Sequence, residues 1–149
     1  MVTMEKLRNE HIDVFKRIQL WESSQIHFLQ ETRDQYPVFV KELSQFFKTG
    51  LAYHFKVEEE ALFPVLKNKV EPSIIQNLLF DHERIIKEFR RFELVEDLDL
   101  SIQILKSLIN YLKIHAQKEE DFFSSVNLSD EEVKQVDAKA KLVELRSGA

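Results

Sequence analysis

The chain has 149 residues, no cysteine and a formal net charge of -5 at pH 7. This length suits one domain with a single core, and the lack of cysteine excludes disulfides, thiolate nucleophiles and iron-sulfur clusters, so any bound metal is held by nitrogen and oxygen. The acidic balance argues against a nucleic-acid partner, and the charged first residues, which contain no long apolar run, predict a cytoplasmic protein without a membrane partner.

Only two glycines and three prolines interrupt the chain, which favours long helices. Apolar residues at helical spacing predict a first helix over residues 4–32. Asp34 as a cap and Pro37 in the first turn predict a second helix that runs to about Lys67. Pro64 is expected to kink or end the regular part of that helix, because it lacks a backbone donor.

Three further helices follow. After the break at residues 71–73, apolar periodicity predicts a third helix over residues 74–89 and a fourth over residues 100–124. The sequence from Ser129 to Glu132 is typical of a capping box, and it opens a weaker amphipathic segment that we interpret as a fifth helix.

The fold class predicted from these elements is all-α, because no strand-like alternation competes with the helical patterns. Four long helices joined by short turns predict an antiparallel up-and-down four-helix bundle with an additional C-terminal helix. Residues 1–127 are expected to form the bundle. Residues 128–149 are expected to be the C-terminal helix and tail of the same domain.

Two histidines begin the same pattern, His-x-x-x-Glu, at His54 to Glu58 and at His115 to Glu119. A step of four residues advances a helix by about one turn, so each pair points to one face. An imidazole and a carboxylate on one helix, repeated on another, can supply terminal nitrogens and bridging oxygens to two cations roughly 3.5 to 4 Å apart. The spacing therefore favours a pair of metal ions.

Four histidines, His11, His54, His82 and His115, also fall at one level if the helices run up and down. At about 1.5 Å per residue, all four lie roughly 10 to 20 Å from the bundle end that holds the amino terminus. Each lies on the apolar face of its helix, whereas His27 is expected at the surface. The alternative interpretation is a metal-free scaffold. In such a scaffold the buried imidazoles and glutamates would lack partners, and each unpaired polar group would cost roughly 1 to 3 kcal/mol.

The pattern resembles the hemerythrin-like family, also called HHE cation-binding domains, over roughly residues 5–125. The matching segments are His11, His54-Phe-Lys-Val-Glu58-Glu59, Leu62-Phe63-Pro64, Asp81-His82-Glu83-Arg84-Ile85, His115-Ala-Gln-Lys-Glu119-Glu120 and Phe122-Phe123. The resemblance implies two non-haem iron ions joined by an oxo or hydroxo bridge. The implied metal ligands are four terminal histidines and two bridging glutamates: His11, His54, His82, His115, Glu58 and Glu119.

One position departs from the family pattern. Oxygen-carrying members usually have a further histidine one turn before the histidine of the third helix, and here that position is Leu78. Glu59, Glu83 and Glu120 are alternatives for a replacement ligand, although each is explained more simply as a solvated neighbour of a ligand. The missing ligand argues against carrier-type reversible oxygen binding and leaves a position open for water, dioxygen, nitric oxide or peroxide.

The leading interpretation is a non-haem di-iron protein that binds dioxygen or a related small ligand. Its role would be oxygen or nitric oxide binding, sensing or iron handling. The alternative is a di-iron enzyme that acts on peroxide, nitric oxide or ferrous iron, and a third interpretation is storage or signalling through the C-terminal helix. Zinc and manganese are alternative metals, because imidazoles and carboxylates accept them too. The oligomeric state is left open.

Two further expectations concern the surroundings of a bound ligand. Apolar residues within a turn or two of the ligands are candidates for the walls of its pocket and equally for plain core: Phe15, Phe47, Leu51, Leu78, Ile86 and Tyr111. Tyr111, one turn before His115, is also a candidate hydrogen-bond donor to bound oxygen. Ferritin-like di-iron enzymes are the nearest competing bundle, but they use Glu-x-x-His, a spacing that this sequence lacks.

Overall fold

The structure, a computed structural model, describes residues 2–30 and 33–147, without the side chains of residues 24–30. Throughout these ranges every regular element is a helix, so the predicted all-α class is confirmed. The first helix, α1, spans Val2–Gln30. Its predicted end at residue 32 and the side chain of His27 lie outside the described residues.

The second helical stretch begins with a 3₁₀ turn at Arg33–Gln35 and contains two π-helical turns. Its parts are α2 (Tyr36–Gln45), η2 (Phe46–Leu51), α3 (Ala52–Val57), η3 (Glu58–Leu62) and α4 (Phe63–Leu66). Pro37 lies in the first turn of α2 as predicted, but the prediction of Asp34 as the cap is wrong. Asp34 lies inside the 3₁₀ turn, so the residue before α2 is Gln35, whose side chain makes no capping bond.

Pro64 interrupts the regular helix without ending it. Its ring removes a backbone donor and crowds the carbonyl four residues earlier, that of Glu60. The wider π-helical turn η3 lies directly before it, and the Phe63 N–H donates to the carbonyl of Glu58, five residues back. The helix then continues to Leu66, close to the predicted end.

The remaining helices are α5 (Pro72–Leu94), α6 (Leu98–Ser125) and α7 (Asp130–Arg146). The Asp97 carboxylate caps α6 by accepting from the Leu100 N–H at 2.8 Å. Ser129 and Glu132 form the predicted capping box at the start of α7. Within the described ranges, no helix combines the length and the apolar composition that a membrane crossing requires.

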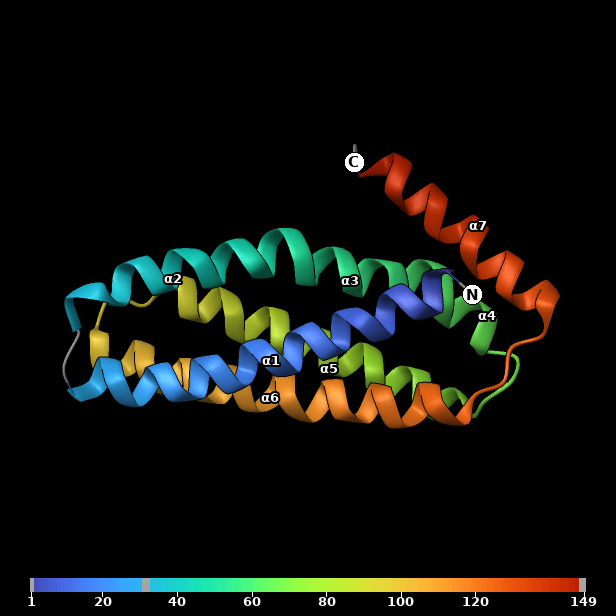
Figure 1. Ribbon diagram of the computed structural model, residues 1–149. Helices are drawn as coiled ribbons and strands as arrows, with labels where there is room; N and C mark the ends of the chain where they lie inside the picture. Colours follow the sequence, from blue (N-terminus) through green and yellow to red (C-terminus); the bar gives the residue numbers. More distant parts are fainter. Residues whose placement is uncertain (1, 31–32, 148–149) are drawn as a thin grey trace.

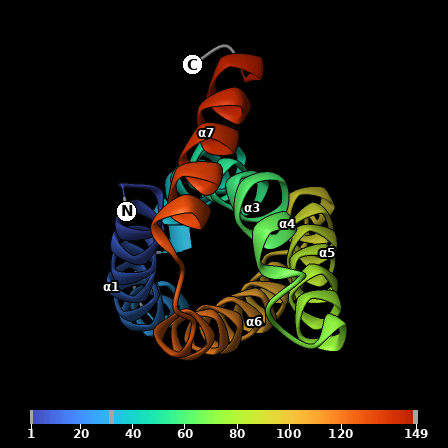
Figure 2. The same ribbon diagram turned by 90° about the vertical axis from the view of Figure 1, so that its right-hand side faces the viewer.

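Figure 1 shows α1, the stretch from α2 to α4, α5 and α6 lying lengthwise beside one another, each running opposite to the one before it. Figure 2, which looks along them, shows these segments around a common interior, with α7 over the end where the chain begins. Both α1 and α5 pack on α6, and α7 packs on η3 and α1.

A layer of titratable side chains divides the apolar core into two clusters. The larger cluster draws on all four long segments and includes Trp21 of α1, Phe47 of η2, Phe89 of α5, and Leu105 and Leu112 of α6. The smaller cluster lies toward the amino terminus and includes Leu7, Leu62, Leu78, Phe123, Val136 and Val143. Because the last two belong to α7, the C-terminal helix completes the smaller cluster.

Candidate metal centre

The six predicted ligand residues come together in the layer between the two apolar clusters. Each is almost fully buried, with exposures of 2% for His11, 3% for His54, 0% for Glu58, 1% for His82, 2% for His115 and 1% for Glu119. They form two overlapping groups, one with His11 and His54 and the other with His82 and His115, and both groups contain Glu58 and Glu119. Within each group the potential ligand atoms lie within 4.8 Å of one another.

The two glutamates lie between the imidazole pairs. Glu58 Oε2 lies 3.4 Å from His54 Nε2, whereas Glu58 Oε1 lies 3.2 Å from His82 Nε2. Glu119 Oε1 lies 3.1 Å from His115 Nε2 and 3.3 Å from His11 Nε2. Each carboxylate therefore reaches imidazoles of both pairs, as a carboxylate that bridges two cations must.

The outer nitrogen of every one of these imidazoles is hydrogen-bonded to a carboxylate. The Nδ1 partners are Glu120 for His11 (3.2 Å), Glu10 for His54 (3.1 Å), Glu59 for His82 (2.7 Å) and Asp81 for His115 (3.0 Å). A carboxylate only accepts, so each Nδ1–H donates and the lone pair of the neutral ring is on Nε2. All four lone pairs are thus directed into the layer.

These four bonds form a closed ring around the layer. Glu10 of α1 accepts from His54 of the second helical stretch, and Glu59 of that stretch accepts from His82 of α5. Asp81 of α5 accepts from His115 of α6, and Glu120 of α6 accepts from His11 of α1. Each carboxylate lies next in sequence to a predicted ligand but bonds to the histidine of the neighbouring helix. The ring therefore ties the four helices together at the level of the predicted ligands.

Inside the ring, several buried polar atoms have no hydrogen-bond partner among the described residues. They are Nε2 of His11, His82 and His115, both carboxylate oxygens of Glu58, and Oε2 of Glu119. The Nε2 atoms of His11, His82 and His115 lie 3.1 to 3.6 Å from carboxylate oxygens of Glu58 and Glu119, but none of these separations forms a hydrogen bond. Each unpaired buried group costs about 1 to 3 kcal/mol, whereas coordination of cations would use all of these lone pairs, so the residues fit a metal site.

The electrostatics of the layer favour positive charge. Burial lowers the pKa of His82, but the carboxylates of Glu119 and Glu58 outweigh burial and raise that pKa to about 11. The same balance raises the pKa of His11 to about 10 and that of His54 to about 9. Burial alone would raise the pKa of Glu58, yet the neighbouring imidazoles hold it well below its ordinary value. The layer therefore attracts either protons or metal cations.

His82 is enclosed by a single segment of the second helical stretch. The Phe55 ring stacks on its imidazole with centroids 3.9 Å apart, and the Phe63 ring lies 5.9 Å away at 23°. Glu58 faces its Nε2 at 3.2 Å and Glu59 accepts from its Nδ1 at 2.7 Å. The π-helical turn η3 supplies both glutamates, so this irregular turn, which lies against α7, positions His82 on both sides.

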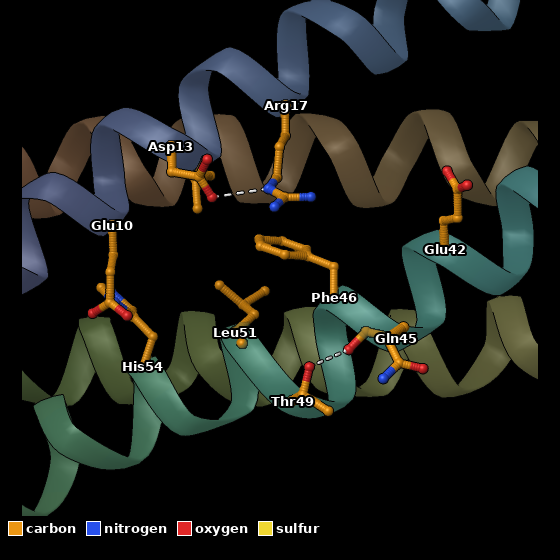
Figure 3. A pocket seen from close by; sticks show the side chains of 11 residues that line it. Glu10, Asp13, Arg17, Glu42, Gln45, Phe46, Thr49, Leu51 and His54 are labelled. Carbon is orange, nitrogen blue, oxygen red and sulfur yellow. Dashed lines mark hydrogen bonds and ion pairs between the residues drawn. The ribbon is translucent and has the colours of Figure 1, made fainter.

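His54 lies instead beside an open pocket of about 350 Å³ between α1 and the α2–α3 stretch. Figure 3 shows Glu10 and His54 together at one end of this pocket and Arg17 above the Phe46 ring farther along it. The Arg17 guanidinium lies 4.4 Å from that ring centre and donates to Asp13 at 2.8 Å. The pocket therefore leads from the surface to the outer edge of His54.

The other residues considered from the sequence have different positions. Glu59 and Glu120 do not turn inward as replacement ligands, because each accepts a hydrogen bond from the outer nitrogen of a histidine. Glu83 is exposed, and Leu78 is buried in the smaller cluster. Tyr111 is half-buried with the Arg84 guanidinium 4.3 Å from its ring centre, and both line a small pocket at His115. That arrangement gives no support to a hydrogen bond from Tyr111 to bound oxygen.

Among the residues predicted to line a ligand pocket, Phe47 and Leu51 are buried in the larger cluster, and Phe15 and Ile86 pack against it half-buried.

Glu10 and Asp81 are the residues that sequence reasoning missed. The available signal was an acidic residue directly before His11 and directly before His82. Because each bonds to a histidine on another helix, the signal becomes meaningful only when the helix arrangement is known.

The sequence profile of the hemerythrin HHE cation-binding domain matches residues 2–98. This match includes His11, His54, Glu58 and His82, and α6 then adds His115 and Glu119 to the same layer. No curated protein and no solved structure gives a significant match to the chain. The matched region is more than half of the chain, and its buried histidines and glutamates form a cluster that fits a metal site. The chain belongs to the hemerythrin HHE cation-binding domain family.

Proposed function

We propose that this protein is a non-haem di-iron protein that binds dioxygen or a related small ligand such as nitric oxide. The proposed ligands are His11, His54, Glu58, His82, His115 and Glu119. A bound iron pair supplies the electrons and the coordination position that such a ligand requires. The observation that carries the proposal is a set of six buried nitrogen and oxygen atoms, all in one layer, that have no hydrogen-bond partner in the part of the chain that the structure describes.

The arrangement supports two ions rather than one. Each imidazole pair has its own two nitrogens and shares the two glutamates with the other pair. Two nitrogens and two shared oxygens leave further positions free on a first-row metal ion that takes five or six ligands. The role of the chain is to hold the four lone pairs in place through the Nδ1 bonds and to exclude bulk water from the layer.

The pocket beside His54 supports exchange of a small ligand with solvent. Its floor includes Val14, Leu51 and His54, which are 4%, 3% and 3% exposed, and its rim is polar. We infer that a diatomic or triatomic ligand reaches the layer from this side. The same access favours the second candidate function, an enzyme that acts on peroxide, nitric oxide or ferrous iron, and steady-state turnover with those substrates would separate catalysis from binding.

We also infer that the four long segments form an antiparallel up-and-down four-helix bundle and that residues 128–149 belong to the same domain. The alternating directions of the segments in Figure 1 support the first inference. The burial of Val136 and Val143 in the smaller core cluster supports the second.

The test is to purify the protein with added ferrous iron, count metal per chain, and record its visible spectrum reduced, after air, and after azide. The proposal predicts about two irons per chain and a charge-transfer band typical of a bridged pair. A His54→Ala variant should lose that band, whereas Glu83→Gln, which changes an exposed residue next to His82, should keep it. Colourless protein with only a trace of metal would make the proposal wrong.

A further inference from the structure

The four carboxylates around the layer differ in how strongly each can act on its histidine. Glu120 also accepts from Arg8 at 2.7 Å, and Asp81 accepts from Lys118 at 2.7 Å. Those cations neutralise part of the charge that His11 and His115 would otherwise face. Among the described side chains, neither Glu10 nor Glu59 forms an ion pair with a lysine or an arginine.

Geometry separates Glu59 from Glu10. The distance from His82 Nδ1 to Glu59 Oε2 is 2.7 Å, within the 2.7 to 2.9 Å typical of a charge-assisted bond, whereas the corresponding bond from His54 to Glu10 is 3.1 Å long. His82 is also fixed by the stacked ring of Phe55 and is 1% exposed, so its imidazole cannot turn away from Glu59. A full negative charge at this distance makes Nε2 of the same ring a stronger electron donor.

We propose that the ring of carboxylates positions the histidines of the metal centre and that Glu59 is its dominant member, which sets the affinity of the ion at His82 and His115. The inference rests on the proposed function, because it assumes that this layer holds metal ions. Glu59 is a positioning residue: it acts through His82, and its own carboxylate lies on the outer side of the imidazole. The other three carboxylates have the same role with smaller effects.

The test compares Glu59→Gln with two matched variants. Glutamine keeps the shape and an oxygen that accepts from Nδ1, so Glu59→Gln removes only the negative charge. Glu83→Gln removes the same charge from an exposed residue beside His82. Glu120→Gln removes the carboxylate whose charge Arg8 already balances. Competition with a chromogenic chelator would measure the affinity for each of two ferrous or zinc ions.

In Glu59→Gln, we expect one of the two ions to bind about 10- to 100-fold more weakly, the size of effect that loss of an outer partner has at other metal sites. Glu120→Gln should weaken binding less, and Glu83→Gln should leave both affinities unchanged. Unchanged affinities in Glu59→Gln, equal weakening of both ions, or an equal loss in Glu83→Gln would overturn the inference. A wild-type protein that takes up no ion pair would instead overturn the proposed function, and this inference with it.

A second measurement begins with the wild-type protein, so its first part needs no variant. In zinc-loaded wild-type protein, NMR of ¹⁵N-labelled histidines should show His82 protonated at Nδ1 with its proton far downfield, as a short bond to a carboxylate requires. In Glu59→Gln this proton should move upfield, which a merely structural role of Glu59 would not cause. Coordination of His82 through Nδ1, or an unshifted proton in the variant, would overturn the inference.

Discussion

The two imidazole pairs face the same two glutamates but differ in how they are enclosed. The ring centres of His11 and His54 lie 5.0 Å apart, and His54 lines the pocket of about 350 Å³. The ring centres of His82 and His115 lie 4.7 Å apart, and His115 lines a smaller pocket of about 160 Å³. The Phe55 ring covers His82. The comparison teaches that two histidine pairs in one buried layer can differ in how open their surroundings are to solvent. We expect small ligands to arrive at the His54 side.

Glu58 tests whether the two sides depend on one another. Because its two oxygens face different imidazole pairs, Glu58→Leu should remove both ions, so that metal analysis finds close to none per chain. Circular dichroism should still show a helical protein, since leucine of similar volume replaces a buried charge. The control is Glu60→Gln, which lies two residues after Glu58 and pairs with Arg146. This variant should keep both ions. One tightly bound ion in Glu58→Leu would argue against a bridging role.

The difference in enclosure predicts different chemical rescue of two alanine variants. His54→Ala and His82→Ala should each weaken metal binding strongly, because each removes one nitrogen ligand. Added imidazole should restore binding in His54→Ala, since the pocket admits it to the vacated position. It should not restore binding in His82→Ala, where Phe55 and Phe63 enclose the position. Titration of each variant with imidazole and metal would measure this, and equal rescue of both variants would remove the distinction between the two sides.

Metal-free and metal-loaded protein should respond oppositely to pH. Without metal, the raised pKa values of His11, His54 and His82, about 10, 9 and 11 against an ordinary 6.5, contribute stability that is full below pH 6.5 and is lost as pH rises through 9 to 11. With metal, the same imidazoles must be neutral, so protons compete with the ion and stability should rise from about pH 5 to 8. Thermal melts over this pH range, with chelator and with zinc, would compare how the stability of the two forms changes with pH.

The lowered pKa of Glu58 gives the acid limit for the metal-free protein. Its folded value lies well below the ordinary 4.5, so its contribution is present above pH 4.5 and is lost as pH falls through the folded value. Metal-free protein should therefore be most stable between these two limits. Slopes of the same sign with and without metal between pH 6.5 and 8 would contradict the assignment of these histidines as ligands.

Gly50 offers the smallest change at the open side. A Cβ there would meet Phe46 Cδ2 at 3.5 Å, an ordinary contact, so Gly50→Ala should raise the free energy of unfolding by about 0.5 to 1 kcal/mol without changing ligand kinetics. Gly50→Leu should extend into the pocket and slow azide binding several-fold, with metal content unchanged. Stopped-flow absorbance would measure the rates. Equal rates in all three proteins would argue for another route of entry.

Much of the fold was predictable because helical periodicity and capping residues are local signals. The spacing from His54 to Glu58 and from His115 to Glu119 was sufficient to place each pair on one helix face. The two π-helical turns were not predicted, because helical periodicity does not separate a π turn from an α-helical one: η3 lies just before Pro64, and η2 carries Gly50. The ring of outer carboxylates was missed for a related reason: each bond joins two helices, and no spacing within one helix encodes it.

Several expectations remain predictions. Iron as the metal, dioxygen or a related small molecule as the ligand, the cytoplasmic location and the absence of a nucleic-acid partner are expected from composition or from the family resemblance. The geometry bears most closely on the metal, because the layer offers imidazoles and carboxylates, which iron, zinc and manganese all accept as ligands.

Anomalous X-ray diffraction from crystals grown with ferrous iron tests the central claim most directly. Data collected on both sides of the iron absorption edge should show two peaks roughly 3.5 to 4 Å apart. One peak should lie at Nε2 of His11 and His54 and the other at Nε2 of His82 and His115, with Glu58 and Glu119 between them. A single peak, peaks outside this layer, or no iron signal in it would contradict the account.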